Sequence, residues 1–225
     1  MGEFQKLLAD CAEIAEWFPD GVAFIGGIAV YLYAVNGKST KDLAETTHDA
    51  DFYISLADMA DLRDIEEVTP NRRLSKHQMI KHGIEFDIYT ERQSRLIVPF
   101  DAVMAESEVI EGIRLASLEH LLALKLEAYS DRKGTSKGEK DARDLLRICA
   151  VATDREQPFR ASIAQVYLGG EHLALLQDVV KSPQALVLAH GNAQVAKRIR
   201  GCAQSVLDSL REEGDRAEPS WSPSS

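Results

Sequence analysis

Strand-like and helix-like patterns occupy different parts of this sequence, and their segregation most constrains the fold. Short apolar or alternating runs, bounded by glycine and polar residues, occur before residue 117. Residues 117–212 instead show the three-to-four-residue apolar spacing of helices. Strands followed by runs of helices are typical of α+β proteins. We therefore predict a mixed β-sheet with flanking helices over residues 1–116 and a C-terminal helical bundle over residues 117–212.

The expected elements follow from local patterns. In the first part of the chain we predict helices over 3–17, from the glycine pair at 26–27 to about Gly37, and over 58–67. In the second part we predict a helix from Leu118 to about 132, another that starts at 141, and helices over 160–212 with breaks near Pro183 and Gly191. We predict strands over 22–25 and 49–55, a hairpin of 72–80 with 84–90, and a weaker hairpin within 107–116. Residues 38–48 and 132–140 read as loops, and the Pro-, Ser- and acid-rich residues 213–225 as a disordered tail.

Composition excludes several classes of protein. No apolar run approaches the roughly 20 residues that a membrane-spanning helix needs, and the N-terminal segment does not resemble a signal peptide. We therefore expect a cytoplasmic protein without a membrane partner. Three widely spaced cysteines favour reduced, buried thiols over a disulfide framework or a zinc site. A formal net charge of −10 disfavours unspecific polyanion binding, so a nucleic-acid substrate would need a local basic patch.

Two aspartates flank one alanine in the predicted strand 49–55. Because side chains alternate along a strand, Asp49 and Asp51 should share one face while Ala50 points into the fold. Two adjacent carboxylates repel each other unless a cation lies between them, and hard oxygen ligands suit Mg²⁺. Asp87, with Glu85 two residues before it on the same face, supplies a third carboxylate if its strand is a neighbour. Such a trio can hold two metal ions about 4 Å apart. The alternative is a solvated strand end.

A glycine pair joins the predicted strand 22–25 to a helix. Paired glycines mostly form turns, and taken alone they carry little functional information. Placed between a buried strand and a helix start, however, Gly26 and Gly27 leave backbone amides and the positive end of the helix dipole exposed. This position predicts a phosphate-binding turn upstream of the carboxylates.

These motifs together resemble the nucleotidyltransferase superfamily related to DNA polymerase β. Its signature is a Gly-Gly or Gly-Ser turn, then Asp-x-Asp, then an aspartate on a later strand, here Gly26-Gly27, Asp49 with Asp51, and Asp87. A second block, residues 117–148, is similar to the helical segment of the AbiEii-type toxin branch. That segment carries a lysine on one helix and a Lys-Asp-x-x-Asp-Leu element on the next; the matching positions are Lys125, Lys140, Asp141, Asp144 and Leu145.

The resemblance implies a set of roles. Asp49, Asp51 and Asp87 would be catalytic and would hold Mg²⁺, with two ions expected, and Asp87 would help activate the acceptor hydroxyl. Gly26 and Gly27 would bind the triphosphate of an NTP substrate. It also implies that Lys125, Lys140 and Asp141 contact the nucleotide, with Asp144 ranked below Asp141. Without the resemblance, Lys125 reads equally well as a lysine that reaches the surface, and Lys140 with Asp141 as a solvated helix start.

The sequence also departs from the family pattern. Between Gly27 and Asp49 lie 21 residues, a longer gap than usual, and none of them is an arginine. The polar loop from Lys38 to His48 either folds over the nucleotide or serves a partner. His48 directly precedes the aspartates, and lincosamide and aminoglycoside nucleotidyltransferases have a similar histidine near theirs; an exposed loop histidine is the alternative.

Three hypotheses about function follow. The first is a magnesium-dependent nucleotidyltransferase toxin that modifies RNA (tRNA) or protein and is paired with an antitoxin protein. The second is an antibiotic nucleotidyltransferase, and the third is a non-catalytic nucleotide-binding or partner-binding module. A tRNA acceptor requires concentrated positive charge. The candidate basic residues are Arg72, Arg73, Lys76, Lys81, Arg132, Lys133, Lys137, Lys140 and Arg143.

Overall fold

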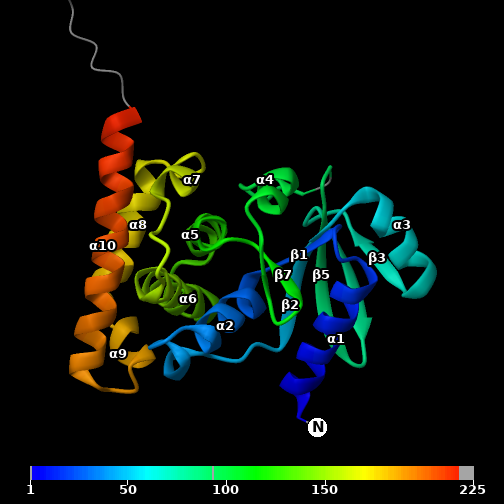
Figure 1. Ribbon diagram of the computed structural model, residues 1–225, viewed down its shortest axis with the longest axis horizontal. Helices are drawn as coiled ribbons and strands as arrows, with labels where there is room; N and C mark the ends of the chain where they lie inside the picture. Colours follow the sequence, from blue (N-terminus) through cyan, green and yellow to red (C-terminus); the bar gives the residue numbers. More distant parts are fainter. Residues whose placement is uncertain (1, 93, 218–225) are drawn as a thin grey trace, which may run out of the picture.

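Figure 1 shows the computed structural model, which describes residues 2–92 and 94–217. A mixed seven-stranded sheet with helices on its faces leads into a layer of helices built from the C-terminal part of the chain (Figure 1). The predicted α+β fold is confirmed. The strands are β1 Val22–Ile25, β2 Asp49–Ile54, β3 Val68–Asn71, β4 Lys76–Lys81, β5 Ile84–Thr90, β6 Glu108–Ile110 and β7 Ile113–Leu115.

The sheet order, β3-β4-β5-β2-β1-β7-β6, places β2 at the centre. β2 runs antiparallel to β1 and parallel to β5, and in these registers Ile25 lies opposite Asp51, which in turn lies opposite Asp87. β1 also pairs in parallel with β7, and the remaining strand pairs are antiparallel. The condition for a three-carboxylate site, that the two aspartate-bearing strands are neighbours, is therefore met.

The helices cover the sheet and then pack on one another. They are α1 Glu3–Trp17, α2 Gly26–Asn36, α3 Leu56–Ile65, α4 Phe100–Ala105, α5 Leu118–Arg132, α6 Ser136–Asp154, α7 Ala161–Gln165, α8 Gly170–Lys181, α9 Gln184–Leu188 and α10 Ala193–Ala217, with a short 3₁₀ helix η1 at Lys41–Leu43. α2 packs on β1 and β2 and also on α5 and α6, while α10 packs along α6 to α9 (Figure 1). α2 thus connects the sheet to the helical layer.

One continuous apolar core runs through the sheet and the helices. Across β1, β2 and β5, the fully buried rings of Phe24, Phe52 and Phe86 lie in a row in tilted and edge-to-face contact, with centroids 5.4 and 6.3 Å apart. Burial of such rings is a large apolar contribution, and each aromatic contact adds about 1 kcal/mol. The even-numbered positions of β2 therefore fix its buried face, which leaves Asp49 and Asp51 on the opposite face.

Several element boundaries differ from those expected from sequence. Residues 72–75 are the turn between β3 and β4 rather than part of a strand. β3 is an additional edge strand that contains Pro70, a residue tolerated at edges because no ladder hydrogen bond is needed on the open side. α4 is a further short helix. α6 begins inside the expected loop 132–140, because the Thr135 hydroxyl caps it by accepting from the Gly138 amide (3.1 Å).

At the C-terminus, α10 continues to Ala217. Residues 213–217, expected in a disordered tail, are therefore helical, and the rest of that expected tail, 218–225, lies outside the described residues. Among the described helices, none combines the length and the apolar character that a bilayer crossing needs. The boundary between the two predicted domains, at residues 116 and 117, stays a prediction.

Candidate active site

Three aspartates meet where β2 and β5 run side by side. Asp49 and Asp51 lie on one face of β2, Ala50 is buried beneath them, and Asp87 is the register partner of Asp51 on β5. Glu85 is the partner of Asp49, but its carboxylate accepts a hydrogen bond from Gln78 (2.6 Å) on β4. The predicted carboxylate trio is therefore brought together by the parallel pairing of two strands.

The glycine turn packs directly against this face. Gly26, at the start of α2, has φ of +70°, a backbone conformation that favours glycine. A Cβ added there would overlap the Asp51 carboxylate, and a Cβ on Gly27 would lie 3.1 Å from the Thr47 hydroxyl. The absence of side chains at these two positions lets the first turn of α2, with its free amides, approach the carboxylates.

Replacing Gly26 with alanine tests this close approach. We expect the variant to lose about 2 kcal/mol or more of stability, because a left-handed alanine costs about 1–2 kcal/mol and its methyl also displaces Asp51. Nucleotide binding should be lost as well. Gly83→Ala is the matched control, because Gly83 also has positive φ (+85°) but has open space around its Cβ position. Urea denaturation and Mg²⁺–NTP calorimetry measure both effects. Equal losses of stability and unchanged binding in both variants would contradict the packing argument.

Asp49 and Asp51 have pKa values shifted in opposite directions. Burial, followed by the neighbouring charges of Asp49 and Asp87, raises the pKa of Asp51 to about 7. Asp49 behaves differently: burial opposes its ionisation, but the hydrogen bond from Thr47 and the charges of Lys140 and Lys125 hold its pKa below the usual value. A carboxylate that cannot ionise easily without a nearby positive charge is suited to a divalent cation.

Asp87 faces a cation supplied by the chain itself. Lys76 on β4 forms an ion pair with Asp87, and only 11% of the Lys76 side chain is exposed. Among the described residues, no group of three or more Asp, Glu, His or Cys side chains is arranged to hold a metal ion. Within the described residues no ion pair involves Asp49 or Asp51, which share one face of β2, whereas Asp87 could join them at a cation only by exchanging Lys76 for the metal. The sequence analysis placed Lys76 in the candidate basic patch and did not predict its pairing with Asp87.

The second motif forms a buried ion-pair network on α5 and α6. Lys125 Nζ lies 3.1 Å from Asp141 Oδ1 and 2.7 Å from Asp144 Oδ2, and Arg132 Nε lies 3.2 Å from Asp141 Oδ2. Although burial disfavours the ammonium, these carboxylates, together with the charge of Asp51, raise the pKa of Lys125. Lys125 therefore stays charged and within electrostatic reach of the carboxylate face, but it does not simply extend to the surface.

The network continues into the loop that precedes β2. Arg147, which is 1% exposed, pairs with Asp144 and also with Glu45 (Nη2 to Oε2, 3.0 Å), and its Nε donates to the Leu43 carbonyl (2.5 Å). Arg143 forms a bidentate ion pair with the same Glu45 carboxylate. These contacts stabilise the ionised carboxylate, so the pKa of Glu45 falls to about 2. Neither Glu45 nor Arg147 was expected at this site.

Two sequence expectations about charged side chains find little support. The side chain of His48 is 84% exposed, and its closest charged neighbour is Glu3 at 3.9 Å, as expected for an ordinary loop histidine. Most of the proposed basic patch is already paired within the chain. Its paired members and their partners are Lys76 with Asp87, Lys81 with Glu13 and Glu66, Arg132 with Asp141, Lys133 with Asp178 and Arg143 with Glu45.

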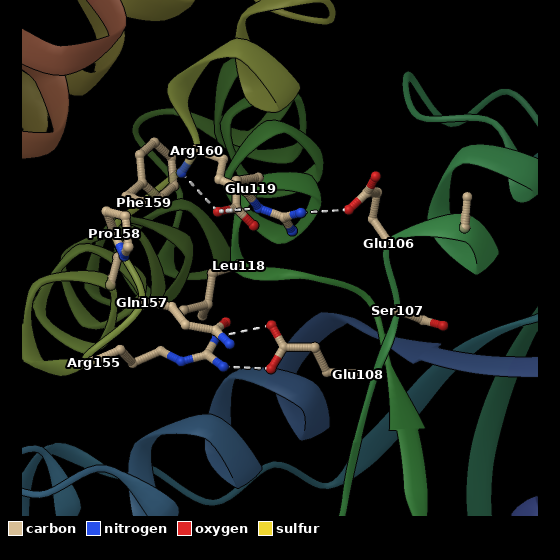
Figure 2. Close-up of a pocket in the computed structure, with 12 residues that line it drawn as sticks. Glu106, Ser107, Glu108, Leu118, Glu119, Arg155, Gln157, Pro158, Phe159 and Arg160 are labelled. Atoms are coloured by element: carbon tan, nitrogen blue, oxygen red, sulfur yellow. Dashed lines mark hydrogen bonds and ion pairs between the residues drawn. The ribbon is translucent and has the colours of Figure 1, made fainter.

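A cavity lies away from the carboxylate face, between the α4–β6 segment and the start of α5 with the α6–α7 link (Figure 2). Its volume is about 490 Å³, and two ion pairs cross it: Arg155 with Glu108 (2.5 and 2.8 Å) and Arg160 with Glu106 (2.6 Å). Glu119 accepts a hydrogen bond from the Arg160 amide at one wall. None of the predicted site residues lines this cavity, so the cavity and the carboxylate face are separate features.

Comparison with known proteins gives structural matches only. No model of a protein family matches the sequence, and no curated protein matches it. JHP933 from Helicobacter pylori matches at a TM-score of 0.50 and 17% identity, over 94% of each chain. A second H. pylori structure, described as that of a provisionally assigned nucleotidyltransferase, matches at a TM-score of 0.50 and 18% identity, over 93% of this chain and 95% of that one. An antigenic nucleotidyltransferase-like protein from Paracoccidioides brasiliensis matches at a TM-score of 0.49 and 15% identity, over 87% of this chain and 92% of that one.

At these identities the two matches from H. pylori show a shared fold and nothing more. The chain therefore has a nucleotidyltransferase-like fold along nearly its whole length, including the C-terminal helices. This agrees with the superfamily that the glycine and aspartate motifs resemble. The AbiEii branch, which rests on the second motif alone, stays a prediction.

Proposed function

We propose that this protein is a nucleotidyltransferase that moves a nucleoside monophosphate from an NTP to an acceptor hydroxyl and releases pyrophosphate. One observation carries the proposal: Asp49, Asp51 and Asp87, from adjacent strands, share one face with the glycine turn that begins α2. Carboxylates that hold Mg²⁺ beside a phosphate-binding helix terminus are the two components that transfer from an NTP requires.

In this proposal Asp49 and Asp51 hold Mg²⁺, and Asp87 completes the site when Lys76 moves away. Bound there, the cation would polarise the phosphoryl oxygens and neutralise the leaving pyrophosphate, with two ions expected. Asp87 accepts the proton of the acceptor hydroxyl as its oxygen forms the new bond to phosphorus. The buried surroundings of Asp51 support this assignment, because its raised pKa reflects a charge that lacks compensation.

The triphosphate would bind at the N-terminus of α2. The amides of Gly26 and Gly27 donate to it, and Lys140, whose ammonium has three donors and gives one to Thr47 (3.2 Å), supplies positive charge. Lys125 adds long-range charge from α5. Asp141 is occupied by Lys125 and Arg132, so its role is to orient these cations around the nucleotide.

For the acceptor we propose RNA (tRNA) or protein, in a toxin that is neutralised by an antitoxin protein. The order of the motifs supports this choice. An antibiotic acceptor is the second candidate, favoured by the net charge of −10, which would attract a cationic aminoglycoside. A nucleotide-binding module without catalysis is the third candidate.

Transfer of radiolabel tests the proposal. The protein is incubated with each α-labelled NTP, Mg²⁺ and, in separate reactions, total tRNA, total protein and a panel of aminoglycosides and lincosamides. We expect one acceptor class to become labelled and pyrophosphate to be released, both dependent on Mg²⁺. Asp61→Asn, an exposed carboxylate on α3, is the control variant and should label as the wild type does.

Calorimetry with Mg²⁺ and NTP separates the remaining outcomes. Binding of NTP without label transfer or pyrophosphate release would support the non-catalytic module and contradict the enzyme. Labelling of antibiotics alone would replace the toxin by a resistance enzyme. In a growth assay, Asp49→Ala should relieve toxicity, and an unrelieved growth defect would count against the toxin role.

A further inference from the structure

The loop between α2 and β2 is fastened to α6 along its length. Ser39 donates from its amide (2.9 Å) and its hydroxyl (2.5 Å) to Asp154, near the C-terminal end of α6. Glu45 pairs with Arg143 and Arg147 in the middle of the same helix. The loop between Ser39 and Glu45 therefore lies against the helical layer rather than over the carboxylate face. Its two contact points hold it in a fixed position relative to α6.

Thr47 is the point at which this loop meets the carboxylates. The residue is 1% exposed, although it lies outside any helix or strand. Its hydroxyl donates to Asp49 Oδ1 at 2.6 Å and accepts from Lys140 Nζ at 3.2 Å. A hydroxyl has one proton to donate and can accept at the same time, so Lys140, Thr47 and Asp49 form a chain of hydrogen bonds with a single consistent direction.

The packing around Thr47 leaves its side chain little freedom. Gly27 lies close to this side chain, because a Cβ added at Gly27 would lie 3.1 Å from Thr47 Oγ1 and 3.2 Å from Thr47 Cβ. Thr47 therefore lies between the glycine turn and the carboxylates, next to Gly27 on one side and hydrogen-bonded to Asp49 on the other. A hydroxyl held in this way fixes the direction from which Asp49 Oδ1 receives its hydrogen bond.

We propose that Thr47 is a positioning residue that holds the Asp49 carboxylate in the orientation that binds the cation. This inference rests on the proposed function. Thr47 donates a hydrogen bond to Oδ1 of Asp49, whose carboxylate would hold the cation, and Lys140 acts on the carboxylate through the threonine. Partners of this kind orient metal ligands, and their loss reduces metal affinity by about 10- to 100-fold.

A purely structural role makes a different prediction. If the buried Thr47 hydroxyl contributed only to the stability of the fold, removing that hydroxyl would lower the stability of the protein and leave its metal affinity unchanged. Thr40 provides the comparison, because it lies in the same loop, is 2% exposed, and donates its hydroxyl to the Ala34 carbonyl rather than to a carboxylate (2.9 Å).

The experiment measures Mn²⁺ affinity of the full chain by electron paramagnetic resonance, together with urea denaturation. Thr47→Val keeps the shape of the side chain and removes the hydroxyl, so we expect Mn²⁺ binding about 10- to 100-fold weaker than in the wild type. Thr47→Ser keeps a hydroxyl at this position, so its Mn²⁺ affinity should lie within about threefold of the wild-type value. Thr40→Val should lose stability and keep the wild-type affinity.

Two results would overturn the assignment: equal Mn²⁺ affinity of Thr47→Val and the wild type, or equal weakening in Thr40→Val. The wild type is also compared with Asp51→Asn. If the wild type binds Mn²⁺ no better than Asp51→Asn does, the metal site itself, and the proposed function with it, is wrong. A failure confined to the Thr47 variants leaves that function standing.

Discussion

Asp51→Asn should lower nucleotidyl transfer by about 10³-fold, which corresponds to about 4 kcal/mol of transition-state stabilisation. Asn keeps the shape of the side chain but supplies a neutral amide in place of a ligand oxygen that carries charge. Radiolabel transfer under saturating Mg²⁺ and NTP measures the loss. Transfer at the wild-type rate would contradict the role of Asp51, and a similar loss in the control Asp61→Asn would show that the effect is not specific to the site.

The same substitution should stabilise the protein in the absence of metal. The pKa of Asp51 is raised in the folded state to about 7, so its ionised form opposes folding. No penalty exists below the pKa of the unfolded chain, near 4; it grows as the pH rises towards 7 and is fully present above that. Asp51→Asn removes this penalty, so with EDTA its melting temperature should exceed that of the wild type at pH 8 and match it at pH 4.

Adding Mg²⁺ should reverse this order at pH 8. A ligand that binds the folded state stabilises it, and only the wild type retains the carboxylate that binds the ion. A melting temperature of Asp51→Asn that stays below the wild-type value at pH 8 in EDTA would contradict the electrostatic account.

Arg147→Met should cost about 3 kcal/mol or more of stability. The guanidinium is 1% exposed and contacts Asp144, Glu45 and the Leu43 carbonyl, so its loss leaves Asp144 buried with less compensation and frees the loop before β2. Removal of one partner from a buried ion pair typically costs about 3–5 kcal/mol. Urea denaturation gives the free energy of unfolding.

Two variants check the cause. Arg143→Met removes a more exposed partner of Glu45, with 18% of its side chain accessible, and should cost about 1 kcal/mol. The double variant Arg147→Met with Asp144→Asn should recover part of the loss, since it removes the buried negative charge as well. An Arg147→Met protein within about 1 kcal/mol of the wild type, or no recovery in the double variant, would show that the network does not hold the loop.

The glycine turn and the Asp49–Asp51 pair could be predicted because their sequence signals are local. Strand β1, the glycine turn and the alternation around Asp49 and Asp51 are each written within a few residues, and the structure reproduces them. The adjacency of β2 and β5 could only be stated as a condition, because strand order depends on pairings between distant segments. β3 was not predicted; its Pro70 disfavours a central strand, and only the edge position seen in the structure accommodates it.

The polar contacts could not be predicted, because their partners lie far apart in the sequence. Lys140 reaches Thr47 across 93 residues, and Glu45 reaches Arg147 across 102. The start of α6 was also hidden, since residues 134–138 have a loop-like composition and the capping role of Thr135 depends on context. A threonine two residues before an Asp-x-Asp pair is a signal that could have identified Thr47.

The position of a bound metal ion tests the central claim most directly. Crystals of the protein with Mn²⁺ and an NTP analogue whose α,β-bridge cannot be cleaved would give an anomalous difference peak at each manganese. We predict a peak in contact with Asp49 and Asp51, with the triphosphate at the start of α2. Manganese and nucleotide bound instead in the 490 Å³ cavity, on Arg155 and Arg160, would contradict this account of the active site.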